Sequence, residues 1–103
     1  MSMLIYDTTI KIDNSIVNEW LQWQKEIYIP RMLDTKLFYD HRLCELLERD
    51  ESEGKTFVVQ YFADNREDYD KYIQHHSTDF YNMAIEKWGD QFIEFCTIMQ
   101  IVQ

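Results

Sequence analysis

The chain has 103 residues, enough for one domain, and it carries ten Lys and Arg against nineteen Asp and Glu, a net charge of −9. Hydrophobic residues make up 46% and aromatic residues 16%, which excludes a disordered chain, while the acidic balance argues against nucleic-acid binding. Only two cysteines are present, which excludes a disulfide scaffold, and every 18-residue stretch carries charge, which excludes a spanning helix. No basic and apolar leader opens the chain, so we expect one acidic, soluble, cytoplasmic domain over residues 1–103, without nucleic-acid or membrane partners.

The first half of the chain predicts a strand, a kinked helix and a second strand. Residues 3–12 are rich in β-branched side chains and alternate between two faces, as in a strand. From Ser15 onward, apolar residues recur at helical spacing and predict an amphipathic helix. Pro30 has no N–H to donate, so the helix is expected to kink there and to add a short turn over 31–36. Residues 38–49 predict the second strand.

The second half predicts a hairpin, a long helix and a last strand. The polar loop 50–54 ends in glycine, which favours a hairpin into a third strand over 55–63. Apolar residues at helical spacing predict one continuous helix over 66–88, and Gly89 is placed to end it. Residues 91–102 alternate and predict the fourth strand.

The β-α-β-β-α-β order predicts an α+β domain with the ferredoxin-like sandwich fold. Its two crossovers are right-handed, its antiparallel sheet has the order 4-1-3-2, and both helices cover one face. Cys44 and Cys96 then lie on opposite edge strands, three strand spacings of about 4.8 Å apart. That separation exceeds the roughly 7 Å between Cα atoms that a disulfide spans. Both thiols are therefore expected to be free.

Several stretches of the chain have a familiar order and spacing. They are LIYDTT at 4–9, EWLQW at 19–23 running into YIP at 28–30, LCELL at 43–47 and WGDQF at 88–92. Together they resemble a small bacterial family known as domain of unknown function 4286. That family resembles the dimeric α/β-barrel superfamily, which includes antibiotic-biosynthesis-type monooxygenases and haem-degrading enzymes. The resemblance implies a dimeric ferredoxin-like fold and carries over no catalytic residue.

The sheet face that the helices leave uncovered is the first candidate site. Its predicted composition is too apolar for a free surface and too polar for a dry core. This mixture indicates a homodimer formed sheet against sheet, which either encloses a small apolar and polar ligand or is only a wet interface. The side chains predicted on this face are Ile5, Asp7, Thr9, Arg42, Cys44, Leu46, Val58, Gln60, Phe62, Glu94, Cys96, Ile98 and Gln100. The polar members predicted to line a ligand cavity are Asp7, Thr9, Arg42, Gln60, Glu94 and Gln100.

Two carboxylates on this predicted face, Asp7 and Glu94, lie on neighbouring strands. Two carboxyl groups in a confined space raise the pKa of one of them and form an acid–base pair. The alternative is that Arg42 or Lys11 neutralises them, or that they lie at a wet rim.

His76 is the candidate for cofactor binding. It falls in the apolar stripe of the second predicted helix, among Tyr69, Ile73 and Phe80. A buried histidine there can ligate haem, and the resemblance adds that haem-degrading relatives use a histidine of their second helix. The alternative is a core histidine satisfied by a carbonyl or a tyrosine hydroxyl. The three histidines do not form an i, i+3 or i, i+4 pair, so no metal site is expected.

These features leave three functional hypotheses. The favoured one is a dimeric accessory or small-molecule-binding domain without a cofactor, because no catalytic motif is recognisable. The second is a cofactor-independent, monooxygenase-like enzyme that uses the cavity on the open sheet face. The third is a haem-binding protein that uses His76.

Overall fold

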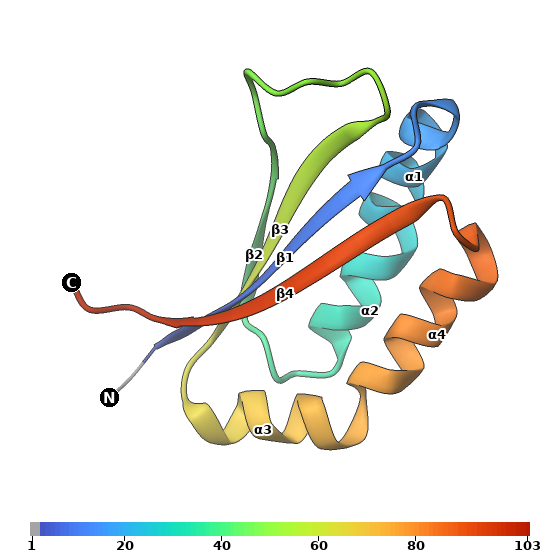
Figure 1. The fold of residues 1–103 in the computed structure, drawn as a ribbon. Helices are drawn as coiled ribbons and strands as arrows, with labels where there is room; N and C mark the ends of the chain where they lie inside the picture. The colour runs from blue at the N-terminus through green and yellow to red at the C-terminus, as the bar shows by residue number, and fades with distance from the viewer. Residues whose placement is uncertain (1–2) are drawn as a thin grey trace.

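The computed structural model describes residues 3–103 and contains one antiparallel sheet (Figure 1). Its strands are β1 (Leu4–Ile12), β2 (Asp40–Glu45), β3 (Lys55–Ala63) and β4 (Phe92–Gln100). They are arranged in the order β2-β3-β1-β4, which is the predicted order read from the other edge. The helical segments all pack on one side of this sheet (Figure 1). The predicted ferredoxin-like sandwich is therefore confirmed.

The first helical layer is made of four short segments rather than one helix. They are η1 (Asn14–Ile16), α1 (Val17–Trp23), the π-helical η2 (Gln24–Tyr28) and α2 (Ile29–Asp34). The proline at position 30 explains the π segment, since it has no N–H for the carbonyl four residues before it. The helix continues by widening one turn instead of breaking.

The single helix predicted over 66–88 is in fact two helices, α3 (Arg66–His75) and α4 (Ser77–Trp88). His76, between them, has a φ of −129° and a ψ of −31°, outside the helical range. The Ser77 hydroxyl donates to the Ile73 carbonyl at 2.9 Å and occupies an acceptor at the break. The break turns α4 away from the direction of α3, and α4 then leads to the start of β4 (Figure 1). Hydrophobic spacing alone did not reveal this break.

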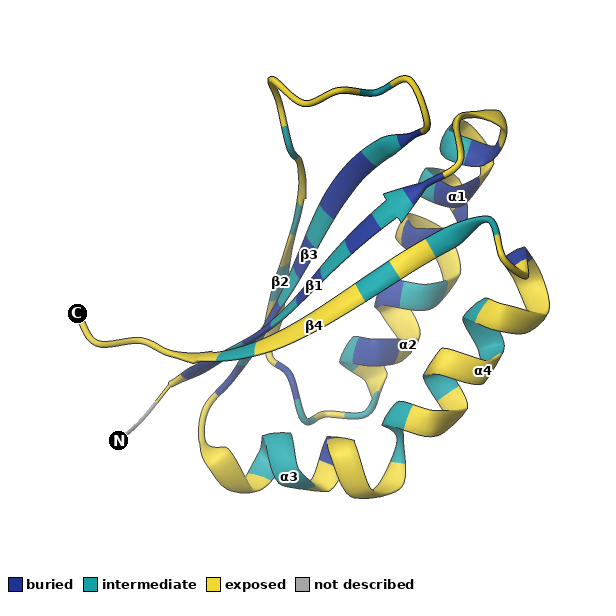
Figure 2. Ribbon diagram, viewed as in Figure 1, coloured by how far each residue is buried: buried dark blue, intermediate teal, exposed yellow. Residues whose placement is uncertain are grey.

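The core lies between the helical layer and the central strands. Figure 2 shows buried residues concentrated on β1, on β3 and on the sheet-facing side of the helices. An aromatic cluster occupies its centre, where the centre of the Tyr6 ring lies 5.3 Å from the centre of the Tyr72 ring and 6.0 Å from that of the Phe38 ring. The most deeply buried large side chains are Trp20, Tyr61, Tyr72, Ile12, Met32 and Val59.

The faces of β4 are the reverse of the prediction. In the register of β1 with β4, Thr8 is opposite Cys96 and Tyr6 is opposite Ile98. Thr8 and Tyr6 are buried under the helices, and directly paired residues share a face. Four residues that were predicted on the open face therefore point to the helical side: Glu94, Cys96, Ile98 and Gln100. That part of the prediction was wrong.

A backbone hydrogen bond at the start of β4 explains the register. The Asp13 N–H donates to the Gln91 carbonyl at 2.9 Å, directly after β1 ends. This bond places Phe92 opposite Ile12 on the helical side, and a shift of one residue would exchange the two faces of the strand.

None of the helices within residues 3–103 is long and apolar enough to cross a membrane.

Candidate functional site

Four of the predicted site residues do gather on the open face of the sheet. Gln60 donates from Nε2 to Asp7 Oδ2 at 3.0 Å, and the Thr9 hydroxyl donates to Asp7 Oδ1 at 3.2 Å. Arg42 is paired with Gln60 across the strands, and its guanidinium lies 5.8 Å from the centre of the Phe62 ring. The open face thus has a small polar centre whose groups already satisfy one another.

The exposed large apolar side chains of the strands on the open face come from β4. Ile93 is 57% exposed, Phe95 68% and Met99 37%, all on the side away from the helices. Figure 2 shows β4 without buried residues, in contrast to the central strands β1 and β3. An apolar surface of this kind beside a polar centre is typical of a protein–protein interface.

A second candidate site lies on the helical side of the sheet. A cavity of about 320 Å³ opens between the sheet and the helical layer. This volume is at the lower end of the range for small-molecule sites. The lining residues come from three strands and from the helical segments: Tyr6, Thr8, Tyr28, Met32, Tyr61, Tyr72, Ile73, Ser77, Thr78, Tyr81, Glu94 and Cys96.

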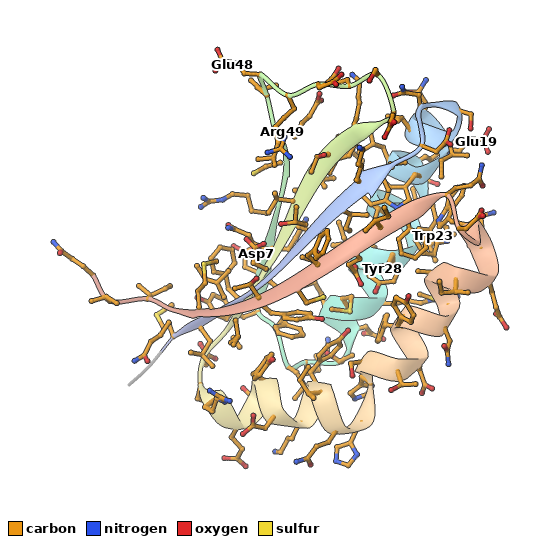
Figure 3. All side chains as sticks on the ribbon, viewed as in Figure 1. Asp7, Glu19, Trp23, Tyr28, Glu48 and Arg49 are labelled. Atoms are coloured by element: carbon orange, nitrogen blue, oxygen red, sulfur yellow. The ribbon has the colours of Figure 1, made fainter. Side chains whose placement is uncertain are left out.

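The irregular points of the helical layer shape this cavity. Tyr28 is the last residue of the π segment, and Figure 3 shows it on the helical layer beside the sheet. Ser77 and Thr78 open α4 immediately after the helix break and also line the cavity. π segments within helices often occur at functional sites, and here one contributes a lining side chain.

A cluster of polar groups lies on the sheet side of the cavity. The Tyr6 hydroxyl donates to Cys96 Sγ at 3.3 Å. The Glu94 carboxyl lies beside the Cys96 thiol, and the Tyr72 hydroxyl beside that of Tyr6, close enough to alter the pKa of the neighbouring group. The predicted Asp7–Glu94 pair does not exist, because Asp7 and Glu94 lie on opposite faces of the sheet.

Burial keeps most of these groups in their neutral forms. Removal from water raises the pKa of the Glu94 carboxyl, and the neighbouring Cys96 thiol opposes that shift. Burial likewise raises the pKa of the Cys96 thiol, so Cys96 is not a thiolate nucleophile at neutral pH. Burial also raises the pKa of Tyr6, Tyr28 and Tyr72, so these tyrosines remain neutral hydrogen-bonding groups.

This arrangement can bind a small molecule and can exchange a proton with it. The tyrosines, the thiol and the hydroxyls offer neutral donors, while Glu94 offers the one carboxylate in the lining. A carboxyl group with a raised pKa is suited to general acid–base chemistry. Within residues 3–103, no three side chains of the metal-binding types come together.

The other sequence candidates lie outside this cavity. Gln100 is opposite Leu4 at the far end of the helical side and is not among the lining residues. His76 is half-buried at the break between α3 and α4, where its ring stacks on Tyr72 at 6.3 Å. It does not line the cavity, and the structure therefore adds no support to the haem hypothesis. Cys44 and Cys96 are both free, as predicted.

The sheet order and the one-sided helical layer define a ferredoxin-like protein, and solved structures of that class are similar to this one. A dimeric ferredoxin-like protein from an uncultured marine organism has a TM-score of 0.71 and 11% identity, over 100% of this chain and 98% of that one. A conserved protein of unknown function from Bacteroides thetaiotaomicron has a TM-score of 0.69 and 12% identity, over 97% and 98%. A cofactor-independent oxygenase from Streptomyces nogalater has a TM-score of 0.64 and 12% identity, over 100% and 96%.

At these identities the likeness shows the fold alone. No curated protein is similar to the chain in sequence. The model of the family named domain of unknown function 4286 matches residues 3–102. The chain therefore belongs to that family, as the sequence resemblance indicated.

Proposed function

We propose that this protein is a homodimer that binds a small molecule in the cavity between its sheet and its helices, with one site in each protomer. The observation that carries the binding function is the cavity itself. It combines an aromatic wall with a cluster of three polar residues on the sheet side, Glu94, Cys96 and Tyr6, in which Tyr6 is hydrogen-bonded to Cys96. Ligand sites in proteins commonly combine a mostly apolar wall with a few convergent polar groups.

The open sheet face supports the dimer. Its apolar β4 side chains lie along one side of the polar centre formed by Asp7 and Gln60, which suits a second copy of the same surface. One of the similar solved structures is a dimeric ferredoxin-like protein. In this arrangement the open face holds the dimer together and the cavity on the other side of the sheet stays accessible.

The binding function is tested by mapping single-ring aromatic compounds of different charge onto the amide resonances of the protein. We expect the largest shifts on the sheet side of the cavity, around Tyr6 and Cys96. Replacing Thr78 with tryptophan fills the cavity and should abolish these shifts. Replacing Asn82, an exposed residue of α4 outside the lining, with tryptophan should leave them unchanged. Shifts confined to the open face, or shifts that Thr78→Trp does not alter, would refute this function.

A second candidate function is catalysis without a cofactor. It is favoured by Glu94, a carboxylate whose pKa burial raises and which lies in an aromatic cavity where it can accept a proton. In such a step Glu94 accepts the phenol's proton and the phenolate passes one electron to dioxygen. The phenoxyl radical and superoxide then combine, with the proton returned from Glu94, to a ring hydroperoxide that loses water to give a quinone. One similar structure is a cofactor-independent oxygenase, and its role extends to this chain only as a hypothesis.

Oxygen uptake separates catalysis from simple binding. With one- and two-ring phenols, an enzyme would consume dioxygen faster than the buffer alone, and Glu94→Gln would remove the excess. If all phenols react at the uncatalysed rate while still binding the cavity, the protein is a binding domain only.

A further inference from the structure

The cavity lining is unusual in its charge. Five of its twelve residues are tyrosines, one is the acidic Glu94, and Lys, Arg and His are absent from the lining. The whole chain carries a net charge of −9, so its field attracts cations and repels anions. Both the local and the overall charge therefore disfavour an anionic ligand.

Among the residues that the structure describes, no cationic side chain forms an ion pair with Glu94. The five ion pairs observed within residues 3–103 all involve other carboxylates. The Cys96 thiol is a polar neighbour of Glu94, and the other residues that line the cavity are aromatic, hydroxyl-bearing or aliphatic. A carboxylate that is partly removed from water without a cation is energetically unfavourable.

We propose that the ligand of this cavity is an organic cation, an ammonium group on a small apolar body, with the Glu94 carboxylate as its counter-ion and the tyrosine rings as its wall. This inference rests on the proposed binding function and names its ligand class. The electron-rich faces of tyrosine rings attract ammonium groups, as in the aromatic cages that bind quaternary ammonium ligands. An ammonium ion would supply the missing partner of Glu94.

The volume of the cavity limits the size of the ligand. A volume of about 320 Å³ accommodates a single ring with a short side chain better than a multi-ring compound. Tyr81 is half-exposed and also lines the cavity, so its ring lies where a ligand would enter.

The test uses four probes that share one benzyl or phenyl body and differ in charge. They are benzyltrimethylammonium, benzylamine, benzyl alcohol and benzoate, and binding to the full chain is measured by titration of the amide resonances. We expect the two cations to bind about tenfold or more tighter than benzyl alcohol, and benzoate to bind weakest.

Two variants, each with a matched control, test the roles of the Glu94 charge and of the Tyr81 ring. Glu94→Gln keeps the shape of the side chain and should weaken both cations by about ten- to a hundredfold, with little effect on benzyl alcohol. Glu86→Gln removes the same charge from the exposed surface of α4 and should change nothing. Tyr81→Leu should weaken the cations, whereas Tyr39→Leu, at an equally exposed tyrosine outside the cavity, should not.

The outcomes distinguish this inference from the function on which it rests. If benzyl alcohol or benzoate binds the cavity as tightly as the cations, or if Glu94→Gln leaves cation binding unchanged, the binding function stands and the organic cation is wrong. If none of the four probes shifts the cavity resonances at about 10 mM, both the binding function and the ligand class fail.

Discussion

Replacing Phe95 with aspartate tests whether the open face of the sheet forms the dimer. Phe95 is 68% exposed in the isolated chain, the largest exposure among the apolar side chains of β4. An aromatic side chain buries about 200 Å² when fully covered, so a partner protomer would cover up to about 140 Å² of Phe95. At about 25 cal/mol per Å², this contact contributes up to about 3.5 kcal/mol.

Symmetry doubles this contribution. A two-fold interface contains the residue twice, which gives up to about 7 kcal/mol, or about 10⁵ in the dimerisation constant. Aspartate in place of Phe95 adds the cost of burying an unpaired charge. The variant should therefore be a folded monomer at concentrations where the parent protein is a dimer.

Light scattering at micromolar concentration measures this directly. The parent should have about twice the 12.7 kDa mass of the chain, and Phe95→Asp should have the mass of one chain with an unchanged circular dichroism spectrum. Ile85→Asp places the same charge on the exposed side of α4, within the helical layer, and should remain dimeric. A monomeric parent, or a Phe95→Asp variant that dimerises as tightly as the parent, would refute the reasoning.

Three further predictions follow from the described contacts. The pKa of Glu94 is raised in the folded state, so folded protein binds more protons than unfolded protein between the ordinary and the raised pKa, and the contribution of Glu94 to stability falls as pH rises through that window. Urea unfolding should therefore find Glu94→Gln gaining stability relative to the parent from pH 4 to pH 8. A stability difference that does not change with pH would contradict this prediction. Gly54→Ala should cost more than Gly89→Ala, several kcal/mol against about 1 kcal/mol, because both have positive φ but only a Cβ at position 54 collides with the Ile12 carbonyl; equal unfolding free energies would contradict this. Thiol titration of the denatured, non-reduced protein should find two free thiols per chain, and a smaller number would overturn the strand order that separates them.

Much of the fold was predictable because short-range signals determine it. The third strand is observed over the predicted residues 55–63, since Gly54 and the polar loop before it mark its start. Pro30 correctly marked the irregularity of the first helical layer, although the π segment itself leaves no clear sequence signal. The break at His76 was not predicted because neither glycine nor proline accompanies it and the apolar spacing continues through it.

The candidate site was harder to predict because it depends on the phase of one strand. The alternation of β4 has two possible phases, and the usual rule buries the more apolar one, which contains Ile93 and Phe95. The structure instead turns these side chains outward and places Glu94 under the helices. The useful signal was the short connection after Gly89, which fixes the first residue of β4 against the end of β1. In a sheet that carries apolar side chains on both faces, hydrophobicity alone does not identify the inner one.

The most direct test of this account is a crystal structure of the protein with benzylamine. We predict that the ligand occupies the cavity between sheet and helices in each protomer, with its ammonium group in hydrogen-bond distance of the Glu94 carboxylate and its ring among the tyrosines. Benzylamine bound on the open face beside Asp7 and Gln60, with the cavity left vacant, would contradict it.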